Sequence, residues 1–196
     1  MPKILIAVPT FETILPETFK SIYALDTKGH NVDFDFVKGY DCARARNEIA
    51  KRAMEGNYDY VLMVDSDIII PDNTIECLLQ SPVDIVYGFC PRKNTTEKKS
   101  TVYKIGKPNF EDCYLFDNLP ALTRVEVKGA GAACAMIKTD IFRKLKYPWF
   151  KYVSYPNNTY LSEDLYFCAE AGKAGYVMWA DTRVRCGHLA RSFQYE

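Results

Sequence analysis

Two aspartates separated by one serine, Asp65-Ser66-Asp67, are the side chains of this sequence best suited to chemistry. They follow an apolar run, Val61–Val64, that is typical of a buried β-strand. Because strand side chains alternate, Asp65 and Asp67 are expected to point at the same place just past the strand end. Carboxylate pairs suit Mg²⁺ or Mn²⁺, and substrate phosphates commonly complete such a metal shell. The pair therefore predicts a metal site that holds a nucleotide diphosphate, although aspartates after a strand also serve as turn and capping residues.

A second acidic group is the segment Ser162-Glu163-Asp164. Ser162 suits a helix N-cap, and acids in a first helical turn are favoured by the helix dipole, which would explain both acids without any function. A carboxylate that faced the metal site could instead remove a proton from an acceptor hydroxyl. The sequence leaves both interpretations open.

Three other groups could reach the same site. His188 follows a predicted strand end, and imidazole suits Mn²⁺ better than Mg²⁺, although a lone histidine is more often a packing or surface residue. Arg44 could pair with Glu48 on a helix surface or meet a phosphate near the helix start. The basic segment 92–99 is either solvated surface or a loop that closes over a diphosphate.

The elements that must position these residues alternate along the first half of the chain. Strands are predicted over 3–8, 31–37, 58–64 and 84–89, and helices over 16–28, 42–55 and 71–80. Asp41 is the expected N-cap of the second helix. This alternation predicts an α/β fold with a largely parallel sheet wound with helices.

The second half has a different pattern. Short antiparallel strands are predicted over 101–103, 113–116 and 123–127, and a small-residue stretch, 129–137, enters a strand. Helices are predicted over 139–145 and from Ser162 to Ala174, and final strands over 176–179 and 183–186. The aromatic segment 146–160 is expected to be an irregular loop, either packed or forming a platform for a sugar acceptor.

Composition limits the class of protein. The 196 residues are 48% hydrophobic and 26% charged, with a formal net charge of zero, which argues against binding mainly to a nucleic-acid backbone. The apolar runs are too short to span a bilayer, and the first residues do not resemble a secretory signal. Seven cysteines without a Cys-x-x-Cys pair favour free thiols, so a cytoplasmic location is expected.

The order of these parts resembles the GT-A-type nucleotide-sugar glycosyltransferases, in particular the family-two-like enzymes of bacteria and phages. The resemblance implies one GT-A-like domain, with a mostly parallel central sheet flanked by helices and a smaller antiparallel portion in the C-terminal half. Its nucleotide-binding half would cover about 1–90 and its donor and acceptor half about 91–196. Five segments carry the resemblance: Ile6-Ala7-Val8-Pro9-Thr10, Ala43-Arg44-Ala45-Arg46-Asn47, Val64-Asp65-Ser66-Asp67, Ser162-Glu163-Asp164 and His188.

The resemblance also implies roles for single residues. Asp67 and His188, with Asp65, would hold Mn²⁺ or Mg²⁺. Asp164 would be the catalytic base of an inverting transfer, with Glu163 as its neighbour or alternate. Cationic help for the leaving diphosphate would come from Arg92, Lys93 or Arg191. The residues implied to bind the nucleotide sugar are Pro9, Thr10, Glu12, Asp41, Arg44, Asp65, Ser66, Arg92 and Gly131.

The expected function is metal-dependent transfer of a single sugar, from a UDP-sugar, to a hydroxyl of a glycan, lipid-linked sugar, protein or modified base. The Gln-x-x-Arg-Trp element of processive synthases is not visible, which favours single transfer. One alternative is a catalytically silent nucleotide-sugar or carbohydrate-binding module. Another is a sugar-phosphate nucleotidyltransferase, but the loop from Pro9 to Thr13 lacks the glycines such an enzyme needs. A third is an interaction domain in which these acids only cap helices and turns.

Overall fold

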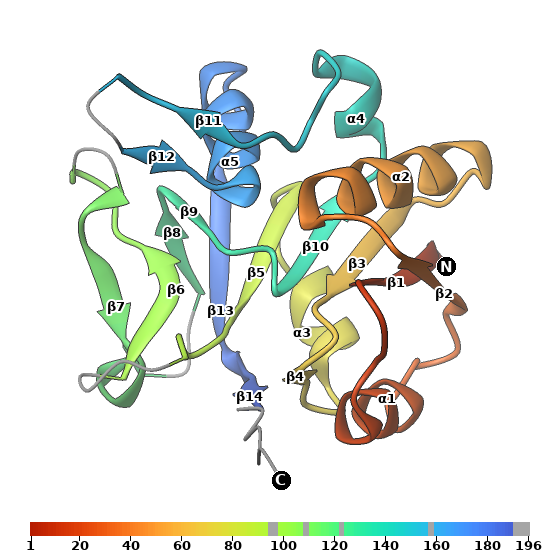
Figure 1. Cartoon of the computed structure of the whole chain (residues 1–196). Helices are drawn as coiled ribbons and strands as arrows, with labels where there is room; N and C mark the ends of the chain where they lie inside the picture. Colours follow the sequence, from red (N-terminus) through yellow and green to blue (C-terminus); the bar gives the residue numbers. More distant parts are fainter. Residues whose placement is uncertain (94–97, 108–109, 122–123, 157–158, 190–196) are drawn as a thin grey trace, which may run out of the picture.

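The computed structural model describes residues 1–93, 98–107, 110–121, 124–156 and 159–189. Within them a seven-stranded sheet has the order β2-β1-β3-β10-β5-β13-β8 (Figure 1). Its strands are β1 (Lys3–Thr10), β2 (Asn31–Lys38), β3 (Tyr60–Val64), β5 (Ile85–Phe89), β8 (Arg124–Val127), β10 (Cys134–Lys138) and β13 (Met178–Arg185). The helices are α1 (Pro16–Tyr23), α2 (Cys42–Glu55), α3 (Thr74–Leu79), α4 (Asp140–Lys144) and α5 (Glu163–Lys173).

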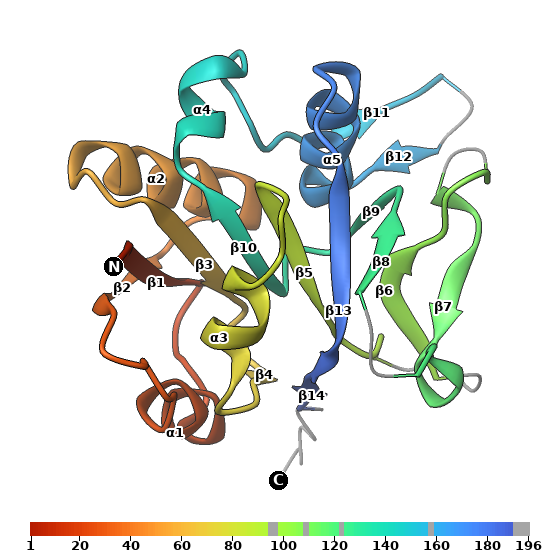
Figure 2. The ribbon, with the colours of Figure 1, turned by 180° about the vertical axis from the view of Figure 1, so that it is seen from behind.

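Helices cover both faces of the sheet, so the fold has three layers. Helices α2, α4 and α5 lie on one face and α1 and α3 on the other, as Figure 2 shows from behind. Strand β1 divides its side chains accordingly: Leu5 joins the apolar cluster beside α2, whereas Ile4 and Ile6 join the cluster beside α1. Burial on both faces explains why the strands of this sheet read as continuous apolar runs.

The sheet is mixed, which refines the expectation of a largely parallel one. Strands β1, β2 and β3 pair in parallel, and so do β5 and β13. Strand β10, however, lies between β3 and β5 and is antiparallel to both, and β8 is antiparallel to β13. The alternation of strands and helices along the first half of the chain carries no information about a later strand that inserts between β3 and β5.

Several small pairings lie outside the main sheet. Strand β6 (Lys99–Tyr103) pairs with β7 (Cys113–Leu115) and β9 (Gly129–Ala130), and a 3-10 helix, Phe116–Asn118, follows β7. The segment expected to be an irregular loop contains β11 (Val153–Ser154), which pairs with β12 (Tyr160–Leu161). Strand β4 (Ile68–Ile69) pairs with β14 (Gly187–His188), a contact that the sequence did not indicate.

Other element ends also differ from the sequence pattern. Helix α1 ends at Tyr23 rather than residue 28, and α3 spans only Thr74–Leu79. The two strands expected over 176–179 and 183–186 form one strand, β13, with an irregularity between Asp181 and Arg185. No helix in the described ranges has the length and apolarity needed to cross a membrane.

Helix α2 begins and ends as predicted. The carboxylate of Asp41 accepts a hydrogen bond of 3.0 Å from the backbone N–H of Arg44, and Gly56 ends the helix. Its buried Asn47 accepts hydrogen bonds from the backbone N–H groups of Trp149 and Phe150, at 3.0 and 3.2 Å. Asn47 therefore ties the segment that leads to α5 onto α2.

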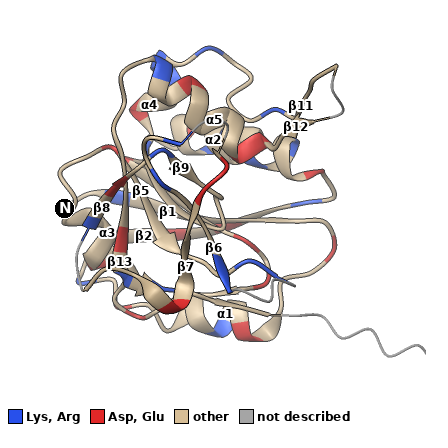
Figure 3. Cartoon of the chain, turned by 90° about the vertical axis from the view of Figure 1, so that its left-hand side faces the viewer, with Lys and Arg blue, Asp and Glu red and all other residues tan. Residues whose placement is uncertain are grey.

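Acidic and basic residues are interspersed along the chain. On the side drawn in Figure 3, Lys and Arg alternate with Asp and Glu and do not gather into a face of one sign. This distribution agrees with the formal net charge of zero.

Candidate active site

A cavity of about 290 Å³ lies where β1 and β3 end and α2 begins. This is the edge at which open α/β sheets bind ligands, because the carboxyl ends of the strands meet there. Six of its lining residues were implied by the resemblance to bind donor or metal: Pro9, Thr10, Asp41, Asp65, Ser66 and Asp67. The rest of its lining is Phe11, Tyr40, Cys42 and Ala45.

Some of the implied residues lie elsewhere. Glu12 is exposed and Arg44 is exposed, and neither lines the cavity. The Arg44 guanidinium lies over the ring of Tyr40, 4.1 Å from its centroid, so it touches the cavity only through that ring. Arg92 lies over the ring of Tyr103, 5.0 Å from its centroid, and Arg191 falls outside the described residues.

The buried guanidinium of Arg46 joins the two acidic motifs. Its two terminal nitrogens donate to Asp65 Oδ1 at 3.0 and 2.9 Å, and its Nε donates to Glu163 Oε1 at 3.2 Å. The Arg46 side chain is only 3% exposed. Arg46 therefore holds the end of β3 and the start of α5 together through charge-assisted hydrogen bonds.

Burial and charge act in opposite directions on this group. Burial disfavours the charge of Arg46, but the neighbouring carboxylates of Asp65 and Glu163 outweigh it and raise the pKa of Arg46. For Glu163, burial is the largest effect and raises the pKa of its carboxyl above the usual range, despite the favourable charge of Arg46. The charged form of the buried Glu163 carboxyl is thus stabilised by Arg46.

Asp67 is held by two partners from distant parts of the chain. Its Oδ2 lies 2.5 Å from Lys93 Nζ, and its Oδ1 lies 3.4 Å from His188 Nε2. Burial favours the neutral carboxyl, but the hydrogen bonds from His188 and Lys93 outweigh it and lower the pKa of Asp67 to about 2. His188 lies near Asp67 because, in strand β14, it pairs with Ile68 of β4, the residue that follows Asp67.

The ring of His188 is oriented by a backbone carbonyl. Its Nδ1 lies 2.7 Å from the carbonyl oxygen of Pro91, and a carbonyl only accepts hydrogen bonds, so Nδ1 carries the proton. Nε2, which faces Asp67, is therefore the nitrogen whose lone pair a metal would use in place of the hydrogen bond to Asp67, as is common in metal-binding histidines.

The donor set fits Mn²⁺ or Mg²⁺ only in part. Asp67 and His188 supply a carboxylate and an imidazole, and Arg46 already occupies Oδ1 of Asp65. In the described part of the chain, no three His, Cys, Asp or Glu side chains gather as a ready-made metal site. Such an incomplete shell suits an ion that keeps waters and takes further ligands from a diphosphate.

Asp164 lies at the first turn of α5. Its Oδ1 accepts hydrogen bonds from the Ser162 hydroxyl and, at 2.7 Å, from the backbone N–H of Leu165. Gly131 lies against its other oxygen: a Cβ there would come within 3.3 Å of Asp164 Oδ2 and 3.1 Å of Thr101 Cβ. Glycine at 131 therefore allows the backbone to approach Asp164 closely.

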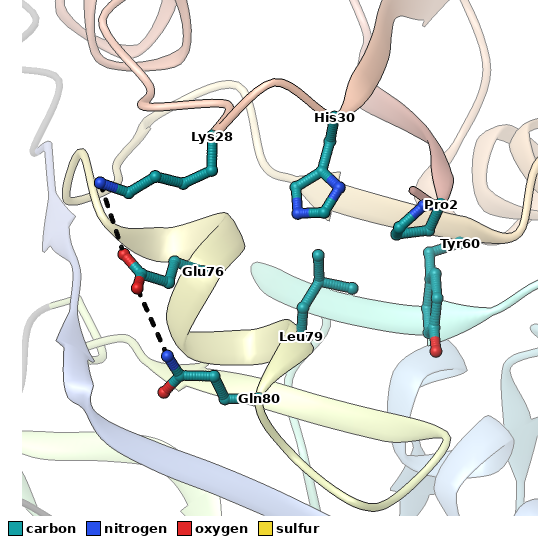
Figure 4. Close-up of a pocket in the computed structure, with 7 residues that line it drawn as sticks. All are labelled: Pro2, Lys28, His30, Tyr60, Glu76, Leu79 and Gln80. Atoms are coloured by element: carbon teal, nitrogen blue, oxygen red, sulfur yellow. Dashed lines mark hydrogen bonds and ion pairs between the residues drawn. The ribbon is translucent and has the colours of Figure 1, made fainter.

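A larger cavity, about 600 Å³, lies at the opposite end of the strands, where they begin (Figure 4). It is lined where β1, β2 and β3 begin, and Glu76 on one side of it pairs with Lys28 at 3.8 Å and Gln80 at 3.4 Å. It contains no carboxylate pair and lies away from the carboxyl ends of the strands. The smaller cavity is therefore the candidate site, because its lining residues can take part in a reaction and those of the larger cavity form no such group.

No protein-family model and no curated protein matches this sequence. Among solved structures, A197 from STIV is similar with a TM-score of 0.69 and 18% identity, over 96% of this chain and 86% of that chain. GalNAc-T7 with UDP, GalNAc and Mn²⁺ is similar with a TM-score of 0.65 and 9% identity, over 97% of this chain. The chain has a GT-A-like fold.

This result confirms the fold that the sequence motifs implied. At such low identity the likeness concerns the fold alone. The match covers 44% of the GalNAc-T7 chain, so this GT-A-like chain spans less than half of that protein.

Arg46 lies at the centre of the site, but the sequence motifs assigned a role only to its neighbour Arg44. A signal was present: Arg46 lies three residues after Ala43 and four before Ala50, on the apolar side of α2. A charge on the buried face of a helix requires buried partners of opposite charge, so its position alone pointed to nearby carboxylates.

We expect Arg46→Met to lower the free energy of unfolding by about 3 kcal/mol, because it leaves two carboxylates without their cation. Adding Glu163→Gln should recover part of this loss, since a neutral amide needs no counter-charge. Urea denaturation measures both. Arg52→Met is the matched control on α2, where the ion pairs with Asp35 and Glu48 are exposed and worth less than about 1 kcal/mol. Equal stability of Arg46→Met and the parent would contradict the role given to Arg46.

Proposed function

We propose that this chain is a metal-dependent glycosyltransferase that moves one sugar from a nucleotide-diphosphate sugar to an acceptor hydroxyl. The observation that carries the proposal is the link from Asp65 through Arg46 to Glu163. This link joins the Asp-x-Asp pair, which lines the cavity, to the acidic start of α5, and a transfer from a donor to an acceptor needs both groups close together.

The donor half of the proposal rests on the cavity. Pro9, Thr10 and Asp41 line its β1 and α2 side, and Asp65 and Asp67 line its β3 side. A nucleoside would lie against the first group and its diphosphate near the second. We favour UDP because GalNAc-T7, which matches 97% of this chain in fold, is described with UDP, GalNAc and Mn²⁺.

Asp67 and His188 would hold the metal, with Asp65 next to it. Mn²⁺ or Mg²⁺, when bound, would supply Lewis-acid stabilisation of the charge on the leaving diphosphate. Lys93 is a second cation at the same carboxylate and, once released from Asp67, would be close enough to meet a diphosphate.

Asp164 is proposed as the base that takes the proton of the acceptor hydroxyl. Its Oδ1 is held by Ser162 and the Leu165 N–H, which fixes the carboxylate beside Gly131. Glu163 is buried against Arg46, so we assign it to positioning the start of α5 and not to proton transfer.

The first test is thermal unfolding with UDP, GDP, CDP or dTDP, each with Mn²⁺ or with chelator. UDP with Mn²⁺ should raise the melting temperature by roughly 5 °C at about 100 times Kd, because it binds only the folded chain. Asp67→Ala should abolish the Mn²⁺-dependent part. Asp117→Ala, which removes an exposed carboxylate paired with Lys98, should keep it. The absence of any shift with all four nucleotides would contradict the proposal.

Asp164→Asn should separate binding from chemistry. It keeps the shape of the side chain but removes the base, so the UDP and Mn²⁺ shift should persist while release of UDP from the UDP-sugar falls about 10²–10⁴-fold. Glu170→Gln, on the same helix and paired with Lys173, is the control and should retain the parent rate. A parent that binds donor but releases no UDP would favour the silent binding module.

Lys93→Met should change two affinities in opposite directions. It removes the ammonium group that competes for Asp67, so Mn²⁺ alone should bind more tightly, as measured by electron paramagnetic resonance of free Mn²⁺. It also removes a cation from the diphosphate, so UDP affinity at saturating Mn²⁺ should fall about tenfold. Unchanged Mn²⁺ affinity would mean that Lys93 does not compete with metal.

A further inference from the structure

The hairpin formed by β11 and β12 leads directly into the start of α5 and carries three exposed tyrosines. Tyr152, Tyr155 and Tyr160 are 48%, 47% and 75% exposed. Exposed aromatic rings on a short two-stranded hairpin add little to a core, and this hairpin ends at Leu161, directly before Ser162. The pairing of β11 with β12 determines which of these tyrosines face the candidate site.

The register of the hairpin separates the tyrosines onto two faces. Ser154 lies opposite Tyr160 and Val153 opposite Leu161, and the N–H of Tyr155 donates to the Thr159 carbonyl in the same register. Since strand side chains alternate, Tyr152 and Tyr160 share one face with Ser154 and Ser162. Tyr155 lies on the other face with Val153 and Leu161, which are partly buried.

The face with Tyr152 and Tyr160 is continuous with the active site. Burial and the neighbouring charge of Glu163 raise the pKa of the Tyr152 hydroxyl, so this side chain lies near Glu163 and near Cys42, which lines the cavity. At the same end of the face, the Ser162 hydroxyl donates to Asp164. A ligand lying on this face would therefore reach the proposed base with one end.

We propose that this tyrosine face, Tyr152, Ser154, Tyr160 and Ser162, binds the acceptor and that the acceptor is a neutral carbohydrate. The face offers aromatic rings and hydroxyl groups but no charged side chain. Rings provide flat apolar surface for the C–H face of a sugar, and hydroxyls provide hydrogen bonds to its rim. An anionic acceptor would find no cation on this face.

This inference rests on the proposed function, because it names the acceptor of the same site. The test measures binding of the parent to immobilised cellobiose, maltose, lactose and chitobiose, with UDP and Mn²⁺ present. At least one disaccharide should be retained. Tyr160→Ala should weaken that binding about tenfold, as expected for the loss of one ring's apolar contact. Tyr160→Phe, which keeps the ring, should bind nearly as the parent does.

Tyr155→Ala is the matched control, because it removes another exposed tyrosine from the opposite face of the hairpin. It should bind the disaccharide as the parent does, and all three variants should keep the UDP and Mn²⁺ shift in melting temperature. Equal weakening by Tyr155→Ala and Tyr160→Ala, or no effect of Tyr160→Ala, would overturn the inference.

The two proposals fail in different ways. A parent that shows the UDP and Mn²⁺ shift but retains none of the four disaccharides overturns the carbohydrate acceptor and leaves the glycosyltransferase proposal standing. A parent that shows no nucleotide shift overturns both.

Discussion

The geometry of the site depends on one buried cation. Arg46 is surrounded by the carboxylates of Asp65 and Glu163 and has almost no contact with solvent. A buried ion pair of this kind contributes little net stability compared with apolar packing, because desolvation offsets the attraction. The pair instead constrains the geometry, because movement of Asp65 or Glu163 would remove a partner from the buried charge of Arg46. Helix α2, the end of β3 and the start of α5 are therefore fixed relative to one another.

The antiparallel insertion of β10 has a similar effect on the other side of the site. Strand β10 begins at the sheet edge where β3 ends, so the small residues before it pass beside the Asp-x-Asp pair. The Asp65 N–H donates to the Ala133 carbonyl at 3.1 Å, and Gly131 meets Asp164. A fully parallel sheet would begin each following strand at the opposite edge. The mixed order thus brings backbone with small side chains beside Asp65 and Asp164.

The sequence was sufficient for the local features and insufficient for the long-range ones. The apolar run before Asp65, the Asp41 cap and the glycine after α2 predicted their elements because each signal lies within a few residues of its effect. Sequence periodicity could not place β10 between β3 and β5, nor pair Ile68 with His188, because these contacts join distant segments. The sequence points to Arg44 and not to Arg46 for a related reason: the position of Arg44 near the start of α2 is a local feature, whereas the partners of Arg46 are carboxylates from distant segments.

Strand β14 has only two residues, and it holds His188 in place through its pairing with β4. Such a short pairing has little cooperative stability of its own, so its opening costs far less free energy than unfolding of the domain. Whatever binds between Asp67 and His188 must therefore also keep β14 closed. The affinity of a ligand at this position is therefore coupled to the local folding of β14. Substitutions that weaken the pairing of β4 with β14 would lower this affinity even at residues that do not contact the ligand.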